Sequence, residues 1–386
     1  MPQDIVFSFF LIFAGALVLA TFALFTRQPV LIAYIALGAL AGPFGMGWIE
    51  HPDKLTDMAH IGIIFLLFLL GLDMQPSALF SVLRKARLVA LASSVIFFAM
   101  GFGITSLLGY SDMDAVIVGL ALMFSSTIIG LKLLPTTVLH HKHSGELMVG
   151  LLLLQDMIAI LTLILLGVLK GESGMPVWQP FAALPVLAVA CYLIVRFVLL
   201  PLIQRFDRYH EYLFILAIGW CLAAAEAAAF MGLTEEIGAF IAGVTLATSP
   251  IAQFIAISLK PLRDFFLVMF FFTLGAGVNL GLLDEVALGA VVLAVIVLAG
   301  KPVVFRVLLG RLSERPSLAW DVGFRLGQIS EFSLLIAFVA VQGGLLTSQA
   351  SLLVQATAVI TFVVSSYIVV FNYPNPIAVN DRLRRD

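Results

Sequence analysis

The fold is decided by two stretches, Phe124-Ser125-Ser126-Thr127 and Leu151-Leu152-Leu153-Leu154-Gln155-Asp156-Met157, each of which places polar side chains inside a long apolar run. Asp156 lies about ten residues, or ~15 Å along a helix, from either end of the apolar run 146–167. That depth is the middle of a bilayer. A charged carboxylate costs ~2.5–3.5 kcal/mol there, so such residues are usually retained for ion or proton work.

The composition is that of an integral membrane protein. Of the 386 residues, 62% are hydrophobic and 11% are charged, which leaves too little charge for a soluble surface. The formal net charge is -2, and no dense basic run indicates nucleic-acid binding. Cys191 and Cys221 fall inside apolar runs, where small buried thiols are expected in place of a disulfide.

Thirteen apolar runs, separated by polar residues or by glycine and proline, are predicted transmembrane helices. They are 4–25, 29–42, 56–73, 88–109, 114–134, 146–167, 178–202, 210–231, 235–249, 264–282, 286–306, 321–340 and 349–371. With the N-terminus outside, most of the 21 basic residues lie at inward ends, as the positive-inside rule requires. The C-terminus is then cytoplasmic.

The runs form two blocks of six with one run between them. An offset of seven makes equivalent helices cross in opposite directions, which is the inverted repeat of many secondary transporters. The predicted domains are 1–177 (first repeat), 178–209 (linker helix), 210–372 (second repeat) and 373–386 (cytoplasmic tail, with no soluble regulatory domain). Corresponding runs are interrupted near their middle, at Ser125–Thr127 and Gly327–Glu331, which predicts a binding site where the repeats meet.

Asp156 is the strongest candidate for ion chemistry, because a desolvated carboxylate can hold either a proton or a small cation. The alternative is that it only neutralises a nearby lysine. Gln155 cannot titrate and adds at most an amide oxygen. Ser125, Ser126 and Thr127 offer hydroxyls beside exposed carbonyls, the oxygen ligands that hard cations prefer. Equally, these hydroxyls could bond back to their own backbone.

Lys301 lies about five residues, or ~7.5 Å, inside the predicted cytoplasmic end of its helix. It could extend to the membrane surface, pair with Asp156, or offset the negative ends of broken helices. Glu331 with Gln328 could form a second polar position on the ion path. Alternatively, Glu331 pairs with Arg325 or with backbone amides. We expect Lys301, Glu331 and Gln328 to balance charge around Asp156.

Six stretches follow one another in a specific order along nearly the whole chain. They are Leu40-Ala41-Gly42-Pro43-Phe44-Gly45, Phe68-Leu69-Leu70-Gly71-Leu72-Asp73, Ser125-Ser126-Thr127, Gln155-Asp156, Gly238-Ala239-Phe240-Ile241-Ala242-Gly243 and Gly327-Gln328-Ile329-Ser330-Glu331-Phe332. Together they resemble the cation:proton antiporter-2 family, especially its Kef-type potassium/proton members.

The resemblance implies an all-α polytopic protein of the bacterial inner membrane with an antiporter fold of the NhaA/NapA type. Each protomer of a homodimer would hold thirteen helices, two of them crossed and partly unwound. Asp156 would be the essential ion- and proton-binding carboxylate, Gln155 its partner, and Lys301 the basic residue beside the crossing. An amide before the aspartate is associated with electroneutral exchange. Kef-type proteins continue into a nucleotide-binding domain, which is absent from this sequence.

The predicted function is exchange of a monovalent cation, K⁺ ahead of Na⁺, for a proton by alternating access around Asp156. No cofactor and no enzymatic activity are expected, since no metal-ligand spacing, nucleotide-binding loop or nucleophile set stands out. Two alternatives stay open. One is a cation channel, in which the broken helices line a continuous pore. The other is an inverted-repeat symporter for an organic anion.

Overall fold

The computed structural model describes residues 5–49, 53–73, 76–132, 143–169, 178–206, 208–249, 252–312 and 314–374, and all regular structure in these ranges is helical. The helices are α1 (Ile5–Phe25), α2 (Val30–Ala41), α3 (Asp53–Asp73), α4 (Pro76–Leu107), α5 (Asp112–Leu122), α6 (Thr127–Lys132), α8 (His143–Leu169), α9 (Trp178–Ile194), α10 (Leu200–Phe206), α11 (His210–Phe230), α12 (Glu235–Leu246), α13 (Ala252–Ala276), α14 (Leu283–Arg311), α15 (Pro316–Arg325), α16 (Glu331–Gln342) and α17 (Ser348–Asn372). A π-helical stretch, Val195–Leu199, joins α9 to α10, and a 3₁₀ turn, Leu280–Leu282, precedes α14.

Every predicted apolar run overlaps a helix or consecutive helical pieces of the described residues. Within the described residues, seven helices are long and apolar enough to cross a membrane, namely α1, α4, α8, the continuous α9–α10, α11, α14 and α17. The chain is therefore a multi-pass membrane protein. That all thirteen runs cross the membrane stays a prediction, and so do the repeats. Of the predicted tail 373–386, only Tyr373 and Pro374 are among the described residues.

The predicted bounds are wrong for the run 264–282. Helix α13 already begins at Ala252 and ends at Ala276. The charged residues Lys260 and Arg263 were expected to precede the helix, but both lie within it. A charged side chain at the end of a membrane helix can remain in water, so it does not stop the helix.

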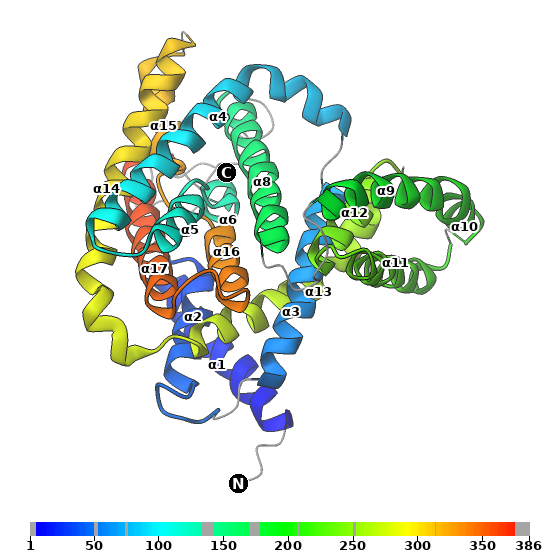
Figure 1. Ribbon diagram of the computed structural model, residues 1–386, viewed down its shortest axis with the longest axis horizontal. Helices are drawn as coiled ribbons and strands as arrows, with labels where there is room; N and C mark the ends of the chain where they lie inside the picture. The colour runs from blue at the N-terminus through cyan, green and yellow to red at the C-terminus, as the bar shows by residue number, and fades with distance from the viewer. Residues whose placement is uncertain are drawn as a thin grey trace.

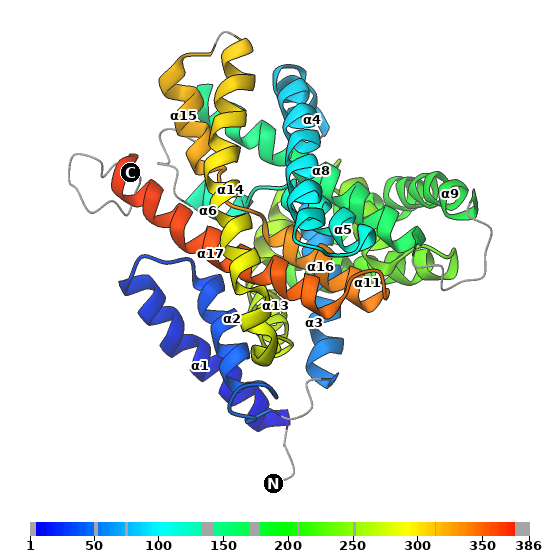
Figure 2. The same cartoon turned by 60° about the vertical axis from the view of Figure 1, so that its left-hand side comes forward.

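The extensive helix–helix contacts fall within two groups. The α3 group contains α1, α2, α3 and α9 to α13, and the α14 group contains α4, α5, α6, α8 and α14 to α17. Figure 1 shows α9, α10, α11 and α12 on one side of the molecule and α14, α15 and α17 on the other. In Figure 2, α1 and α2 lie at the opposite end of the molecule from α15 and the first half of α4.

Glycines bring the helices of the α3 group into backbone contact. A Cβ atom on Gly243 of α12 would lie 2.1 Å from the carbonyl oxygen of Phe68 in α3, and one on Gly71 would lie 2.5 Å from that of Phe240. Small residues permit this close packing, which replaces the hydrophobic effect as the source of helix association inside lipid. Both cysteines, Cys191 and Cys221, are buried and unpaired within the core of this group.

A buried carboxylate joins two helices of the α14 group. One oxygen of Asp114 accepts a hydrogen bond from the Thr347 backbone N–H (2.9 Å), and the other accepts one from the Ser111 hydroxyl (2.8 Å). Ser111 in turn caps α5 by accepting from the Asp114 backbone N–H. The start of α5 is thereby fixed against the start of α17, although the two are far apart in sequence.

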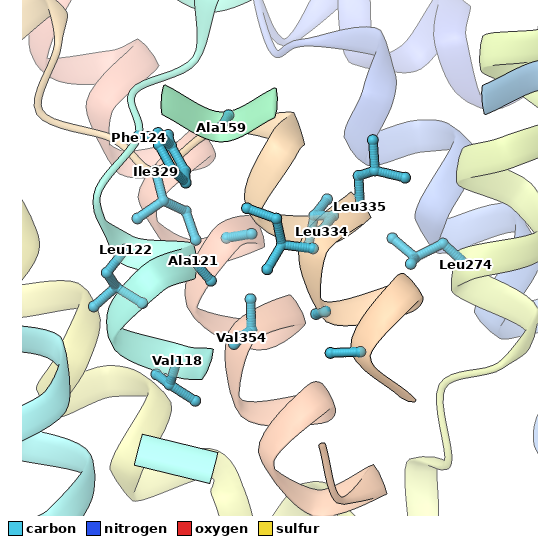
Figure 3. Packing of buried hydrophobic residues seen from close by; sticks show 14 of the residues in the cluster. Val118, Ala121, Leu122, Phe124, Ala159, Leu274, Ile329, Leu334, Leu335 and Val354 are labelled. Atoms are coloured by element: carbon cyan, nitrogen blue, oxygen red, sulfur yellow. The ribbon is translucent and has the colours of Figure 1, made fainter. Parts of the chain in front are cut away.

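The boundary between the groups is packed mainly by apolar side chains. One buried cluster takes residues from α2, α3, α12 and α13 on one side and from α5, α8, α16 and α17 on the other. Figure 3 shows Leu274 of α13 facing Leu334 and Leu335 of α16. The rings of Phe270 and Phe338 meet edge to face across the boundary, 6.0 Å apart. Contacts of this kind have little directionality.

The glycine contacts give the first testable prediction. Gly243→Ala places a methyl group against the α3 backbone, so the helices must separate, and we expect a loss of about 1–3 kcal/mol in stability. Thermal unfolding in detergent measures the loss. The matched control is Gly219→Ala in α11, where the added Cβ meets open space and stability should be kept. Equal melting temperatures for both variants would contradict the packing described above.

Candidate functional site

Two broken helices form the centre of the α14 group. Helix α5 ends at Leu122 and α6 starts at Thr127, while α15 ends at Arg325 and α16 starts at Glu331. Both predicted interruptions are thus present, each beginning one or two residues earlier than expected. Side chains cap the new helix starts: the Ser126 hydroxyl accepts from the Ile129 N–H (3.1 Å), and Ser330 and Ser333 form a capping box at α16.

The two non-helical segments contact each other directly. The Ser125 hydroxyl donates to the Leu326 carbonyl (2.8 Å), and the Gln328 amide donates to the Ser126 carbonyl (3.5 Å). From α8, the Gln155 side-chain oxygen accepts from the Ser125 backbone N–H (3.1 Å). We call the contact between these two non-helical segments the crossing. It is held together by polar atoms of four residues, Ser125, Ser126, Gln155 and Gln328.

Lys301 is buried at the crossing, with 1% of its surface exposed. Its ammonium donates to the carbonyl oxygens of Phe124 (2.6 Å) and Gln328 (3.1 Å) and to the Ser125 hydroxyl (3.4 Å). It also lies 5.0 Å from the centre of the Phe97 ring. The Phe124 carbonyl follows the end of α5, and that of Gln328 follows the end of α15, so the positive charge meets two negative helix ends.

The predicted end of the Lys301 helix at 306 is wrong. Helix α14 continues to Arg311, ten residues or ~15 Å beyond Lys301, because its last turns remain apolar. The Lys301 side chain is 1% exposed and hydrogen-bonded inside the protein, so it does not extend to the membrane surface. Of the three alternatives, the geometry is that of the third: Lys301 binds carbonyl oxygens at the broken helices and forms no ion pair with Asp156.

Asp156 is 1% exposed and lies beside the start of α6. The Thr127 hydroxyl is 3.2 Å and 3.4 Å from the two carboxylate oxygens. Glu331, the first residue of α16, is close enough to interact electrostatically with Asp156. Arg325 bonds Asp321 on its own helix (2.8 Å). The structure thus brings Thr127 and Glu331 to the carboxylate, while Gln155 faces the crossing.

Sequence reasoning missed the contribution of α17. The Ser365 hydroxyl donates to the Gln328 side-chain oxygen (2.8 Å), and the Thr361 hydroxyl accepts from the Ile329 N–H (3.4 Å). Thr357, Thr361 and Ser365 are all buried and repeat every four residues. That spacing puts small polar groups on one face of an apolar helix, and it is the signal that would have found them.

The profile of the family described as "Sodium/hydrogen exchanger, transmembrane" matches residues 10–371, which is nearly the whole chain. The chain belongs to the sodium/hydrogen exchanger family. Proteins with this family's fold are transporters, not enzymes. A solved structure, that of the sodium proton antiporter MjNhaP1 from Methanocaldococcus jannaschii, superposes with a TM-score of 0.72 over 94% of this chain and 95% of that chain, at 16% identity. At that identity the likeness concerns the fold.

Curated relatives in this family include K(+) efflux antiporters of Arabidopsis thaliana. K(+) efflux antiporter 6 is 28% identical over 349 residues, covering 87% of this chain and 58% of its own length. K(+) efflux antiporter 5 is 30% identical over 327 residues, covering 80% and 56%. The chain spans less than two thirds of the length of these relatives. The resemblance to the Kef-type cation:proton antiporters is nonetheless confirmed.

The environment of Lys301 gives the second prediction. Lys301→Met keeps the length of the side chain but leaves the carbonyls of Phe124 and Gln328 without a donor, at a cost of about 1–3 kcal/mol for each buried group. We expect a clearly lower melting temperature in detergent. The control is Lys260→Met, because Lys260 is exposed on α13 and its loss should leave unfolding unchanged. An undiminished melting temperature for Lys301→Met would show that the ammonium does not stabilise the crossing.

Proposed function

We propose that the chain exchanges a monovalent cation for a proton by alternating access around Asp156. The observation that supports this most directly is the separation of the two buried charges. Lys301 is engaged by carbonyl oxygens at the crossing, so the Asp156 carboxylate keeps its negative charge available. A desolvated carboxylate with one hydroxyl beside it can hold a proton or a cation, and competition between the two is exchange.

The ligands available to a cation are hard oxygens. They are the Asp156 carboxylate and the Thr127 hydroxyl, with Glu331 within electrostatic range. Such ligands suit alkali cations. The names of the Arabidopsis relatives favour K⁺ as the cargo, with Na⁺ as the second candidate. Movement of the α14 group against the α3 group would expose Asp156 to one aqueous side at a time, since their boundary is apolar.

The exchange is proposed to be electroneutral. Gln155, next to Asp156, carries no charge. The Lys301 ammonium is hydrogen-bonded to carbonyl oxygens at the crossing, so it keeps the same charge throughout the proposed cycle. If Asp156 alone alternates between its two occupants, one proton crosses for each cation. Titration of Glu331 or Lys301 during the cycle would change this ratio.

The topology proposals are consistent with this function. We retain thirteen membrane helices with the N-terminus outside and the C-terminus cytoplasmic, two inverted repeats at 1–177 and 210–372, and a homodimer in a bacterial inner membrane. Support for the repeats comes from the matched breaks, α5/α6 in the first block and α15/α16 in the second. Unwound backbone at membrane depth is tolerated where it lines a site within the protein.

Asp156→Asn tests the proposed site. In proteoliposomes containing a pH dye, wild-type protein should couple an inward K⁺ or Na⁺ gradient to uphill proton movement, with and without an imposed voltage. The variant should show only the flux of empty vesicles, because an amide neither takes up and releases a proton nor carries the negative charge that a proton and a cation compete for. Asp264→Asn is the control, since this side chain is 57% exposed beside Arg263 and should keep full exchange. Full exchange by Asp156→Asn would remove the carboxylate from the mechanism, and purely downhill flux in the wild type would indicate a channel.

Thr127→Val tests the hydroxyl ligand. The change keeps the shape of the side chain and removes the oxygen beside Asp156, so the half-saturating cation concentration should rise roughly tenfold with little change in maximal rate. Thr162→Val is the control, because that hydroxyl lies on the same helix as Asp156 but bonds back to the Ile158 carbonyl (2.9 Å). Equal half-saturation in both variants would exclude Thr127 as a ligand.

A further inference from the structure

The Gln328 side chain connects α17 to the crossing. It is fully buried, with 0% of its surface exposed. Its amide oxygen accepts a hydrogen bond from the Ser365 hydroxyl of α17 (2.8 Å), and its amide nitrogen donates to the Ser126 carbonyl (3.5 Å). These three residues form one chain of hydrogen bonds, which runs from an unbroken helix through the α15/α16 break to the α5/α6 break.

The chemistry of the three groups fixes the direction of this chain. The Ser126 carbonyl can only accept, so the amide nitrogen of Gln328 must face it. The amide oxygen then faces α17, where the Ser365 hydroxyl must act as the donor. Removing that hydroxyl leaves a buried oxygen without its donor, and turning the amide over would set its oxygen against the Ser126 carbonyl oxygen. Ser365 therefore determines the orientation of Gln328.

The Ser126 carbonyl leads directly to the proposed ion site. It also accepts from the Gly130 N–H (3.0 Å), so the group that Gln328 binds is part of the first turn of α6. The peptide bond between Ser126 and Thr127 is planar, so the direction of its carbonyl fixes the direction in which the chain continues. The Thr127 hydroxyl is 3.2 Å from one carboxylate oxygen of Asp156. A change at the Ser126 carbonyl therefore shifts this hydroxyl relative to the carboxylate.

Helix α17 provides a fixed reference for this positioning, because it is continuous and is bonded to both broken helices. At its start, the Thr347 backbone N–H donates to Asp114 of α5 (2.9 Å). At its end, Arg325 of α15 donates to the Pro374 carbonyl (2.7 Å). Ser365 is thus carried by a helix whose place beside α5 and α15 is set near both ends.

We infer that Ser365 is a positioning residue for the proposed cation site: it orients Gln328, which through the Ser126 carbonyl holds Thr127 beside Asp156. The inference rests on the proposed function, because it takes Thr127 and Asp156 as the ligands. Ser365 acts through these residues and does not itself bind the cation. Its loss should weaken cation binding while the carboxylate stays intact.

The first test compares two neighbouring serines of α17 in proteoliposomes, with K⁺ and then Na⁺ as the probe. Ser365→Ala should raise the half-saturating concentration about twofold to tenfold, which corresponds to the loss of one neutral hydrogen bond, with little change in maximal rate. Ser366→Ala is the matched control. Ser366 is equally buried, but its hydroxyl has no hydrogen-bond partner among the described residues, so exchange should be unchanged. Equal half-saturation in the two variants would overturn the inference.

Two further variants separate positioning from a general loss of stability. Ser365→Cys puts a weaker donor of similar size in place of the hydroxyl, so its half-saturation should lie between those of wild type and Ser365→Ala. If Ser365→Ala does not fold, a wild-type value for Ser365→Cys refutes the positioning role. In a Thr127→Val background, Ser365→Ala should cause no further rise, because the hydroxyl that it positions is already absent. A further rise in the double variant is incompatible with the inference, since Ser365 would then act by another route.

The positioning role and the proposed function fail in different ways. A lower melting temperature of Ser365→Ala in detergent, with unchanged half-saturation, would make Ser365 a structural residue only and leave Asp156 in its role. Exchange that persists in Asp156→Asn contradicts the proposed function instead.

Discussion

The ammonium group of Lys301 is the interaction on which the transport core depends. Two helices that break inside a membrane leave carbonyl groups that water cannot reach, and each such group costs several kcal/mol if it has no partner. Lys301 supplies hydrogen bonds to the carbonyls of Phe124 and Gln328 from a third helix, α14. The chain can therefore unwind at two places and still bury both.

The same arrangement keeps unlike charges apart. A lysine beside Asp156 would form a stable ion pair, and a cation would then have to displace it. Placing the positive charge on helix ends, with Phe97 behind it, leaves the carboxylate to interact with Thr127 and Glu331. All of these groups belong to the α14 group, whose boundary with the α3 group is mainly apolar.

Much of this architecture is predictable from sequence, because membrane insertion imposes simple rules. The thirteen apolar runs match helices, and both breaks follow from polar residues in apolar surroundings. Asp156 stands out because charge is costly at that depth. The partners of Lys301 could not be predicted in this way, because they are mainly backbone carbonyls, which every residue has. Helix bounds were wrong at α13 and α14 because charged and apolar turns near the membrane surface are both compatible with a longer helix.

The two cysteines have a practical consequence. Cys191 and Cys221 are both buried, and both belong to the α3 group, which leaves the described part of the α14 group without any cysteine. Both native cysteines are therefore shielded from thiol-reactive labels, and labelling would be directed to cysteines introduced by mutation. A pair of engineered labelling positions, one on each helix group, could carry spin or fluorescent labels, and the distance between the labels would report directly whether the two groups move relative to one another.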